Sequence, residues 1–304
     1  MPAHFADTLL KRIADKGSPV CVGLDPVYER LPQELREGPP SVQRRAEAVG
    51  EFCRQIIRAV APYVPAVKPQ IAYFEQYGYL GVREYYRVVV EALAADLSVI
   101  GDVKRGDIGS TAEAYAKAHL RRSLQDEAGR PCTPDAITVN GYFGDDGLEP
   151  FITAARQEGK GLFVLVRTSN PGGAAVQDFA EPGGREFFVH MAEQVARIGD
   201  RAELIGQSGY SCVGAVVGAT YPQEARRLRQ VMRRQIFLVP GYGAQGASAA
   251  DCAAAFGEDG RGAIVNASRS VIYAFKDNAD VAWQKAVAQA AAGFAKDIAA
   301  AVRS

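Results

Sequence analysis

The sequence lacks an excess of either charge, because its 304 residues include 35 Lys and Arg and 35 Asp and Glu. A balanced chain has no long-range field that draws it to nucleic acid or to an anionic membrane, so any anion it binds must be held by local geometry. The chain also lacks an apolar run near the roughly 20 residues that span a bilayer. Residues 1–16 lack the continuous apolar core of a signal peptide. We therefore expect a soluble, cytoplasmic protein with no nucleic-acid or membrane partner.

The sequence has few residues for thiol or metal chemistry. Its five cysteines are widely spaced, odd in number and without a CxxC pair, which argues against a disulfide framework or a zinc site and suits a reducing cytosol. The histidines His4, His119 and His190 are scattered and form neither a metal-ligand pair nor a Ser–His–Asp grouping. We therefore predict no metal site.

The sequence does contain eight short, continuously apolar runs rich in Val, Ile and Leu. Such runs without alternation are typical of strands buried on both faces, as in parallel sheets. The runs are residues 19–24 (PVCVGL), 64–71 (VPAVKPQI), 98–103 (SVIGDV), 136–140 (AITVN), 161–166 (GLFVLV), 212–219 (CVGAVVGA), 236–240 (IFLVP) and 262–266 (GAIVN).

The segments between these runs have helical periodicity, clearest at residues 41–61, 111–124 and 222–232, and a final Ala-rich helix is expected at 279–302. Eight strand–helix units in 304 residues predict a single (β/α)8 TIM-barrel domain over residues 1–304. An open doubly wound sheet is the alternative, but the turn at residues 23–26 (GLDP) lacks its GxGxxG fingerprint.

Polar residues recur where the predicted strands end, and that end of a barrel carries its chemistry. A single such residue, for example Asp25 before Pro26, is better explained as a turn former or a helix cap. Seven strand ends with polar groups are harder to explain in that way. These groups are Asp25, Lys68, Asp102 with Lys104, Asn140, residues 167–170, Gln245 and Arg269.

The third run carries the most specific pattern. Asp102 and Lys104 are two apart on a strand and project to the same side, so a carboxylate and an ammonium group face the barrel mouth together. Asp107 follows in the loop, and Lys68 adds a second cation from the neighbouring strand. Alternating charges satisfy one another and keep both lysines protonated. This suits proton donation to a carbanion and disfavours Schiff-base chemistry, whereas the alternative is a surface salt-bridge cluster.

Two loops near the end of the chain predict a phosphate site. Residues 240–246 (PGYGAQG) form a glycine-rich segment whose backbone N–H groups can approach an anion closely. Residues 266–270 (NASRS) supply an arginine and a helix start. Loops after strands seven and eight bind phosphate in many barrels, although either loop alone is consistent with turn chemistry. Residues 171–184, rich in Gly and Pro, are expected to form a mobile loop or a plain surface connection.

Taken together, these residues resemble the orotidine 5′-phosphate decarboxylase family from residue 20 to about residue 273. The most specific match is residues 101–111 (GDVKRGDIGST). The supporting matches are residues 23–26 (GLDP), 67–70 (VKPQ), 168–172 (TSNPG), 240–246 (PGYGAQG) and 268–270 (SRS). The resemblance implies a carboxy-lyase that converts orotidine 5′-monophosphate to uridine 5′-monophosphate in de novo pyrimidine synthesis, without a metal or a cofactor.

By this resemblance, four charged residues form the catalytic group: Lys68, Asp102, Lys104 and Asp107. Lys104 would protonate C6 of the pyrimidine as carbon dioxide leaves. Asp102 would lie near the substrate carboxylate, and Lys68 would bridge Asp102 and the ribose.

The resemblance also implies the substrate contacts and a partner. Asp25 would bind the ribose hydroxyls and Ser169 the pyrimidine edge. The phosphate end would be formed by Gln245 and Arg269, with Pro240 and Ser268 beside them. In this family, Asp107, Ile108 and Thr111 reach into the site of the neighbouring subunit, which implies a homodimer with shared active sites.

The sequence departs from the family pattern in three places. Residues 28–45 and 176–209 are longer than in compact members, so the chain resembles the larger bacterial branch. Residues 140–142 read Asn-Gly-Tyr where that branch often has Asn-Pro-Tyr. An insertion around residues 267–268 leaves Arg269 as the best match for the phosphate arginine.

Two alternatives to the decarboxylase hypothesis stay open. A metal-dependent sugar-phosphate decarboxylase or aldolase of the same barrel superfamily would have an acidic metal ligand on the second strand, where this chain has Lys68. A non-catalytic nucleotide-binding barrel would act as a sensor, but binding alone does not require two buried Lys–Asp pairs.

Overall fold

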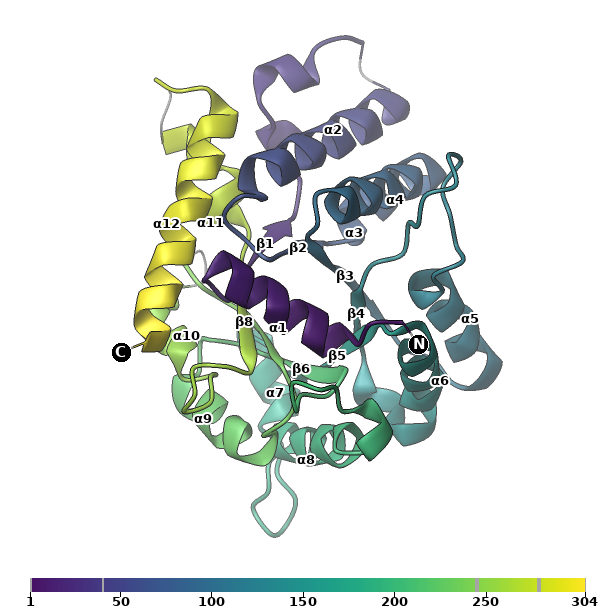
Figure 1. The fold of residues 1–304 in the computed structure, drawn as a ribbon, viewed down its shortest axis with the longest axis vertical. Helices are drawn as coiled ribbons and strands as arrows, with labels where there is room; N and C mark the ends of the chain where they lie inside the picture. Colours follow the sequence, from purple (N-terminus) through teal and green to yellow (C-terminus); the bar gives the residue numbers. More distant parts are fainter. Residues whose placement is uncertain (1, 40, 244–245, 278–279, 304) are drawn as a thin grey trace.

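Eight parallel strands close into a barrel in sequence order in the computed structural model, which describes residues 2–39, 41–243, 246–277 and 280–303. Strand β8 pairs with β1, which confirms the predicted (β/α)8 architecture and excludes the open sheet (Figure 1). The strands are β1 (Val20–Leu24), β2 (Ala66–Pro69), β3 (Ser98–Arg105), β4 (Ala136–Val139), β5 (Gly161–Arg167), β6 (Val213–Val217), β7 (Phe237–Pro240) and β8 (Ala263–Ala267).

Each strand falls on one of the eight apolar runs. Every residue of β1, β2, β4, β6 and β8 is buried. One side of each strand faces the barrel interior and the other faces the helices, so both sides exclude water and an alternating polar pattern does not arise.

The helices form a layer outside the barrel (Figure 1). Helix α2 begins after Ser41, whose hydroxyl oxygen accepts a hydrogen bond from the Arg44 N–H at 3.1 Å. The helix expected at residues 111–124 is shifted toward the N-terminus, because α5 ends at Leu120 and residues 121–124 form a turn. The longer helices are α1 (Phe5–Lys16), α2 (Val42–Val60), α4 (Gly78–Ala94), α5 (Gly109–Leu120), α6 (Gly144–Glu158), α8 (Phe187–Gly199), α9 (Pro222–Val231) and α12 (Trp283–Arg303). The short helices are α3 (Ala72–Glu75), α7 (Ala174–Gln177), α10 (Ala249–Ala253) and α11 (Arg269–Ile272).

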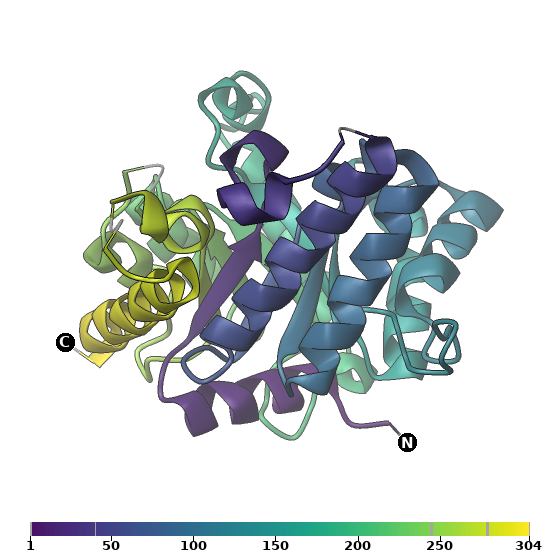
Figure 2. The ribbon, with the colours of Figure 1, turned by 90° about the horizontal axis from the view of Figure 1, so that it is seen from above.

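Helix α1 crosses the amino-terminal end of the barrel, as Figures 1 and 2 show together. The Phe5 ring meets the Phe163 ring edge-on, with centroids 5.9 Å apart. Gly161 leaves the space for this contact, because a Cβ there would lie 2.1 Å from the Phe5 ring. The helix therefore closes this end of the barrel with packed side chains.

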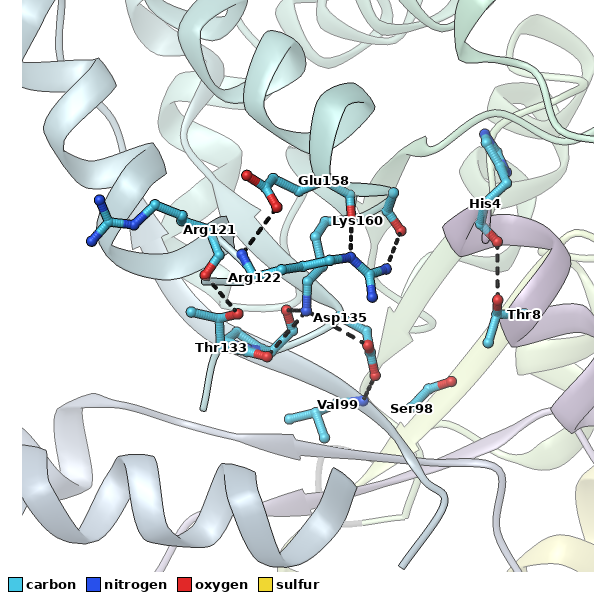
Figure 3. A network of polar contacts seen from close by, with 12 residues as sticks. His4, Thr8, Ser98, Val99, Arg121, Arg122, Thr133, Asp135, Glu158 and Lys160 are labelled. Atoms are coloured by element: carbon cyan, nitrogen blue, oxygen red, sulfur yellow. Dashed lines mark hydrogen bonds and ion pairs between the residues drawn. The ribbon is translucent and has the colours of Figure 1, made fainter. Parts of the chain in front are cut away.

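A polar network lies beside α1 at the same end (Figure 3). Lys160 is buried, and its Nζ donates hydrogen bonds to the carbonyl oxygens of Thr133 (3.1 Å) and Pro134 (2.8 Å). It also lies 3.8 Å from Oδ1 of Asp135, whose Oδ2 accepts a hydrogen bond from the Val99 N–H at 3.0 Å. A network at the amino-terminal end of a barrel is expected to serve stability, because the chemistry of these barrels lies at the opposite end.

Two insertions stand at the opposite end of the barrel, over the carboxyl ends of the strands (Figure 2). The first follows β1 and holds the 3-10 turns Tyr28–Arg30 and Gln33–Arg36. The second follows β5 and holds the 3-10 turn Pro171–Gly173 and helix α7. The segment expected to be a mobile loop or a plain connection at 171–184 therefore contains short helices.

No helix in the described part of the chain combines the length and the apolar character needed to cross a membrane.

Candidate active site

A cavity of about 300 Å³ opens at the carboxyl ends of the strands. Residues from the ends of β1 through β8 line it, as expected for a barrel whose chemistry lies at this end. Its polar lining is Asp25, Lys68, Asp102, Lys104, Thr138, Thr168, Ser169, Asn170, Tyr242, Asn266, Ser268 and Arg269. Its remaining lining is Leu165, Val216, Leu238, Pro240 and Gly241.

Asp102 lies at the centre of the charged part of this cavity. Its Oδ2 accepts hydrogen bonds from Nζ of Lys68 at 2.6 Å and from Nε2 of Gln70 at 2.9 Å. Its Oδ1 accepts from Nζ of Lys104 at 2.5 Å and from the Thr138 hydroxyl at 2.9 Å. Four donors therefore saturate one buried carboxylate, and the alternation of Lys68, Asp102 and Lys104 expected from the sequence is present.

The pairing fixes the charges of Asp102 and Lys68. Burial alone would raise the pKa of Asp102, but the charges and hydrogen bonds of Lys68 and Lys104 outweigh it and hold this pKa well below its usual range. Burial alone would lower the pKa of Lys68, but Asp102 and then Asp25 outweigh it and raise the pKa above its ordinary value. Both groups are therefore ionised near neutral pH.

The backbone at Lys104 is not that of a regular strand. Its φ is +45°, in the left-handed region that residues other than glycine rarely adopt, and the pairing of β3 with β4 shifts register between Gly101 and Arg105. The Lys104 N–H donates to the Thr138 hydroxyl oxygen at 3.0 Å. Asp102 and Lys104 do face the cavity together, but through a bulge that no feature of the sequence indicated.

Asp25 follows β1 and lines the cavity beside this group. Its Oδ1 is buried and has no hydrogen-bond partner among the described residues, and the residue that precedes the next helical turn, Tyr28–Arg30, is Val27 and not Asp25. Its carbonyl oxygen accepts a hydrogen bond from the Tyr273 hydroxyl at 3.2 Å. Asn266 at the end of β8 also has a buried Oδ1 without a partner in the described chain. Asp25 and Asn266 both line the cavity, and neither of these two oxygens has a donor among the described residues.

The predicted phosphate end is formed by the loops after β7 and β8. Pro240, Ser268 and Arg269 line the cavity there, whereas Gln245 lies outside the described residues. Ser268 fits only because residue 23 is glycine, since a Cβ on Gly23 would lie 2.0 Å from the Ser268 Oγ. The arginine expected to meet an anion is therefore at the cavity.

Three predicted residues do not line this cavity. Asp107 follows β3, and its Oδ1 accepts a hydrogen bond from the Ile108 N–H at 2.8 Å. Ile108 is 56% exposed, and Thr111 is exposed on α5. Near them, Tyr142 and Phe143 are 76% and 44% exposed. The chain by itself does not bring Asp107, Ile108 and Thr111 to the site formed by the other predicted residues.

Several lining residues were not singled out from the sequence. Thr138 had a signal, because it is the polar residue of an otherwise apolar strand, and Asn266 lay within a quoted motif without a role. Gln70, which donates to Asp102 without lining the cavity, likewise lay within a quoted motif. Leu165, Val216 and Leu238 had none, because every strand is apolar and the sequence does not show which side faces the cavity.

Comparisons with known proteins point to one family. Residues 18–284 match the family model described as the orotidine 5′-phosphate decarboxylase / HUMPS family. An orotidine 5′-phosphate decarboxylase of Rhodopirellula baltica is 46% identical over 274 residues, covering 90% of this chain and 89% of that protein. One of Clostridium novyi is 38% identical over 270 residues, covering 89% of each chain.

Solved structures are similar over the whole chain. A crystal structure from Streptomyces avermitilis has a TM-score of 0.82 at 36% identity, covering 100% of this chain and 97% of that one. The structure of Leishmania donovani OMP decarboxylase has a TM-score of 0.75 at 30% identity, covering 99% and 100%.

Proposed function

Because the chain belongs to the orotidine 5′-phosphate decarboxylase / HUMPS family, we infer that it decarboxylates orotidine 5′-monophosphate to uridine 5′-monophosphate in pyrimidine synthesis. Relatives up to 46% identical over 90% of the chain carry the name of this decarboxylase. The observation that supports the mechanism best is the buried Asp102 held between Lys68 and Lys104, at 2.6 Å and 2.5 Å.

Lys104 is the proposed proton donor. The bond between C6 and the carboxylate breaks with its electron pair left on C6, and carbon dioxide departs. A proton on Nζ of Lys104 then forms the new C6–H bond, and the neutral amine takes a proton back from water. The 47% exposure of the Lys104 side chain supports this return path.

Asp102 and Lys68 set the charge around the reacting carbon. We place Asp102 near the substrate carboxylate, and its low pKa keeps it anionic beside a group that is about to leave. The positive charge of Lys68 offsets part of the repulsion between Asp102 and the substrate carboxylate. In the proposed complex, Lys68 also reaches the ribose. Its raised pKa leaves no neutral amine for a Schiff base.

The remaining cavity groups fit the rest of the nucleotide. The unpartnered Oδ1 of Asp25 is an acceptor for a ribose hydroxyl, and Ser169 is placed to meet the pyrimidine edge. Arg269 supplies a guanidinium fork for the phosphate. Pro240, Ser268 and Gln245 complete the proposed phosphate end.

The proposed reaction uses no metal or cofactor, so the binding energy of the substrate must supply more of the lowering of the activation barrier. One ion contact at about 4 Å supplies only about 4 kcal/mol at an effective dielectric near 20. Loss of carbon dioxide without an electron sink needs a barrier lowered toward the top of the roughly 8–23 kcal/mol range of enzymes. Phosphate and ribose contacts must therefore contribute to the transition state as well as to binding.

We place the active enzyme in a homodimer. Asp107, Ile108 and Thr111 would enter the site of the second copy, so that each site combines residues of two chains. The exposed apolar side chains of Ile108, Tyr142 and Phe143 support this placement, because they lie around Asp107 and would be covered by a second chain. The five unpaired cysteines are typical of a reducing compartment, and we place the enzyme in the cytoplasm.

The test is turnover by purified protein treated with a chelator. Orotidine 5′-monophosphate is added, and loss of its ultraviolet absorbance is followed with and without added Mg²⁺. Turnover without metal is expected, and a Lys104→Ala variant should lose it. Turnover that appears only with metal would favour the sugar-phosphate decarboxylase or aldolase alternative. Tight binding of uridine 5′-monophosphate without any turnover would favour a nucleotide sensor.

A further inference from the structure

Arg167, the last residue of β5, bonds three side chains close to the cavity without lining it itself. It is 2% exposed. Its Nε and Nη2 donate to the two carboxylate oxygens of Glu224 at 2.6 Å and 3.1 Å. Its Nη1 donates to Oδ1 of Asp178 at 2.5 Å and to Oε1 of Gln177 at 3.4 Å. The guanidinium thus joins β5 to helix α9 and to the insertion that follows β5.

Aromatic rings hold the same guanidinium on its faces. Its carbon lies 4.5 Å from the centroid of Tyr221 and 4.8 Å from that of Phe188. A buried charge is tolerated only when it is fully paired, and the planar fork of arginine suits this combination of stacking and two-point hydrogen bonding. Hydrogen bonds and aromatic contacts therefore both restrain the guanidinium of Arg167.

Gln177 connects Arg167 to the cavity wall by hydrogen bonds. Its Oε1, which accepts from Arg167, also accepts from the Thr168 N–H at 3.0 Å. Its Nε2 donates to the Thr168 hydroxyl oxygen at 2.7 Å, and that hydroxyl donates to Oδ1 of Asn170 at 2.6 Å. Gly173 permits the approach, because a Cβ there would lie 2.8 Å from the Thr168 Oγ1. Thr168, Ser169 and Asn170 all line the cavity.

Gly218, which directly follows β6, supports Ser169 from the other side. The Gly218 N–H donates to the Arg167 carbonyl oxygen at 2.9 Å. A Cβ on Gly218 would lie 3.2 Å from Cα and Cβ of Ser169. Ser169 therefore packs against Gly218 on one side, and its two flanking residues, Thr168 and Asn170, belong to the hydrogen-bond network of Gln177 on the other.

We propose that Arg167 is a positioning residue, which acts through Gln177 to hold Ser169 at the pyrimidine edge of the substrate. This inference rests on the proposed function. By this proposal the insertion at residues 171–178 contributes to substrate positioning, because it carries both Gln177 and Asp178. The described residues of the loops after β7 and β8, which form the phosphate end of the cavity, make no hydrogen bond or ion pair with this network.

Arg167→Lys tests the proposal, because lysine keeps the charge but loses the fork. Gln177→Ala is the second variant: it leaves both carboxylates on Arg167 and removes the hydrogen bonds of Gln177 to Arg167 and to Thr168, so it serves even if Arg167→Lys fails to fold. The matched control is Arg227→Lys. Arg227 pairs with both carboxylate oxygens of Glu186 at 3.0 Å and 2.9 Å and lies over the Phe188 ring at 5.9 Å, without a contact to Gln177.

Affinities for uridine 5′-monophosphate and for ribose 5-phosphate, measured by calorimetry, separate positioning from a general structural effect. Arg167→Lys and Gln177→Ala should weaken binding of the nucleotide about tenfold, equal to about 1.4 kcal/mol, and leave ribose 5-phosphate unchanged. Arg227→Lys should change neither. Equal losses for both ligands, or no loss for the nucleotide in either variant, would overturn the proposal.

Turnover separates this inference from the proposed function. Both variants should lower kcat/KM for orotidine 5′-monophosphate, and the Arg167→Lys/Gln177→Ala double variant should be no worse than Arg167→Lys, because the two residues act along one path. Losses that add in the double variant would overturn the path. Wild-type protein that neither binds the nucleotide nor turns it over would overturn the proposed function, and the inference with it.

Discussion

Nζ of Lys104 lies 2.5 Å from Oδ1 of Asp102, two residues earlier on β3, and the backbone that carries the lysine there has a φ of +45°. A left-handed backbone costs a residue with a Cβ roughly 1–2 kcal/mol. The cost falls on the residue that we propose as the proton donor, and strain of this kind is concentrated at functional sites.

Replacing Lys104 should therefore separate stability from activity. Lys104→Gly and Lys104→Ala both remove the amine, so both should lose turnover. Glycine adopts a positive φ without penalty, so Lys104→Gly should be more stable than Lys104→Ala by about 1 kcal/mol, the reverse of the order in regular elements. Urea unfolding of the two variants measures the difference. A more stable alanine variant would show that the left-handed backbone is not retained.

Asp102→Asn should make stability depend on pH. In the wild type, the lowered pKa of Asp102 contributes stability above its ordinary value of about 3.9, and the raised pKa of Lys68 contributes below about 10.4, so the pair is insensitive to pH between them. Asparagine leaves Lys68 buried with Asp25 as its remaining carboxylate, and burial then lowers the pKa of Lys68.

The unfolded variant would then bind more protons than the folded one, and stability would rise with pH. The apparent Tm of Asp102→Asn, relative to wild type, should increase from about pH 6 to about pH 9. The Lys68→Met/Asp102→Asn double variant is the control, and it should show no such increase. A Tm of Asp102→Asn that does not change with pH would mean that burial does not lower the pKa of Lys68 in the folded variant.

Arg269→Ala should lower kcat/KM for orotidine 5′-monophosphate by about 10- to 100-fold, because a hydrogen bond to a charged group contributes about 1.5–3 kcal/mol. Part of the loss should fall on kcat, since remote binding energy also serves the transition state. Orotidine, which has no phosphate, is the control substrate. Equal losses on both substrates would indicate a disturbed fold instead of a lost phosphate contact.

Mixing two inactive variants should restore activity if sites are shared. In a dimer of Lys104→Ala with Asp107→Asn, one site carries both changes and the other carries neither. Random mixing makes half of the dimers hybrid, so about a quarter of wild-type activity should return in a two-fold dimer. Activity after mixing and re-equilibration is the measurement. No recovery from dimers shown to exchange would place Asp107 in the site of its own chain.

Lys160→Met should affect stability and leave chemistry alone. The change leaves the buried carbonyl oxygens of Thr133 and Pro134 without their donor, at a cost of about 1–3 kcal/mol. The control is Lys117→Met, because Lys117 pairs with Glu113 at 3.3 Å on the surface, where such pairs contribute about 0–1 kcal/mol. Thermal unfolding should separate the two variants, whereas kcat should match the wild type in both. A drop in kcat with Lys160→Met would link this end of the barrel to the reaction.

The barrel could be predicted from the sequence because its strands are buried on both faces. Such strands appear as uninterrupted apolar runs, and polar residues at their ends stand out against them. For this reason the sequence predicts Lys68, Asp102 and Arg269 at one cavity. Helix ends were less well defined: α5 stops at Leu120, although the helical pattern continues to residue 124.

The parts that could not be predicted depend on contacts between distant segments. The bulge at Lys104 is held by Thr138, which belongs to the next strand. Arg167 looked like one more polar residue at a strand end, because its partner Glu224 lies 57 residues away. A single sequence shows residue types and local spacing, whereas these positions are set by pairing across the barrel.

The seam between β1 and β8 also determines when the site can be completed during translation. Asp25 is synthesised well before Asn266 of β8 and Arg269, which line the same cavity. Until β8 emerges, the nascent sheet has two unpaired edges, at β1 and at β7, and open edges invite pairing with other chains. Pairing of β8 with β1 therefore removes both open edges and brings the last strand's part of the site beside the first strand's part.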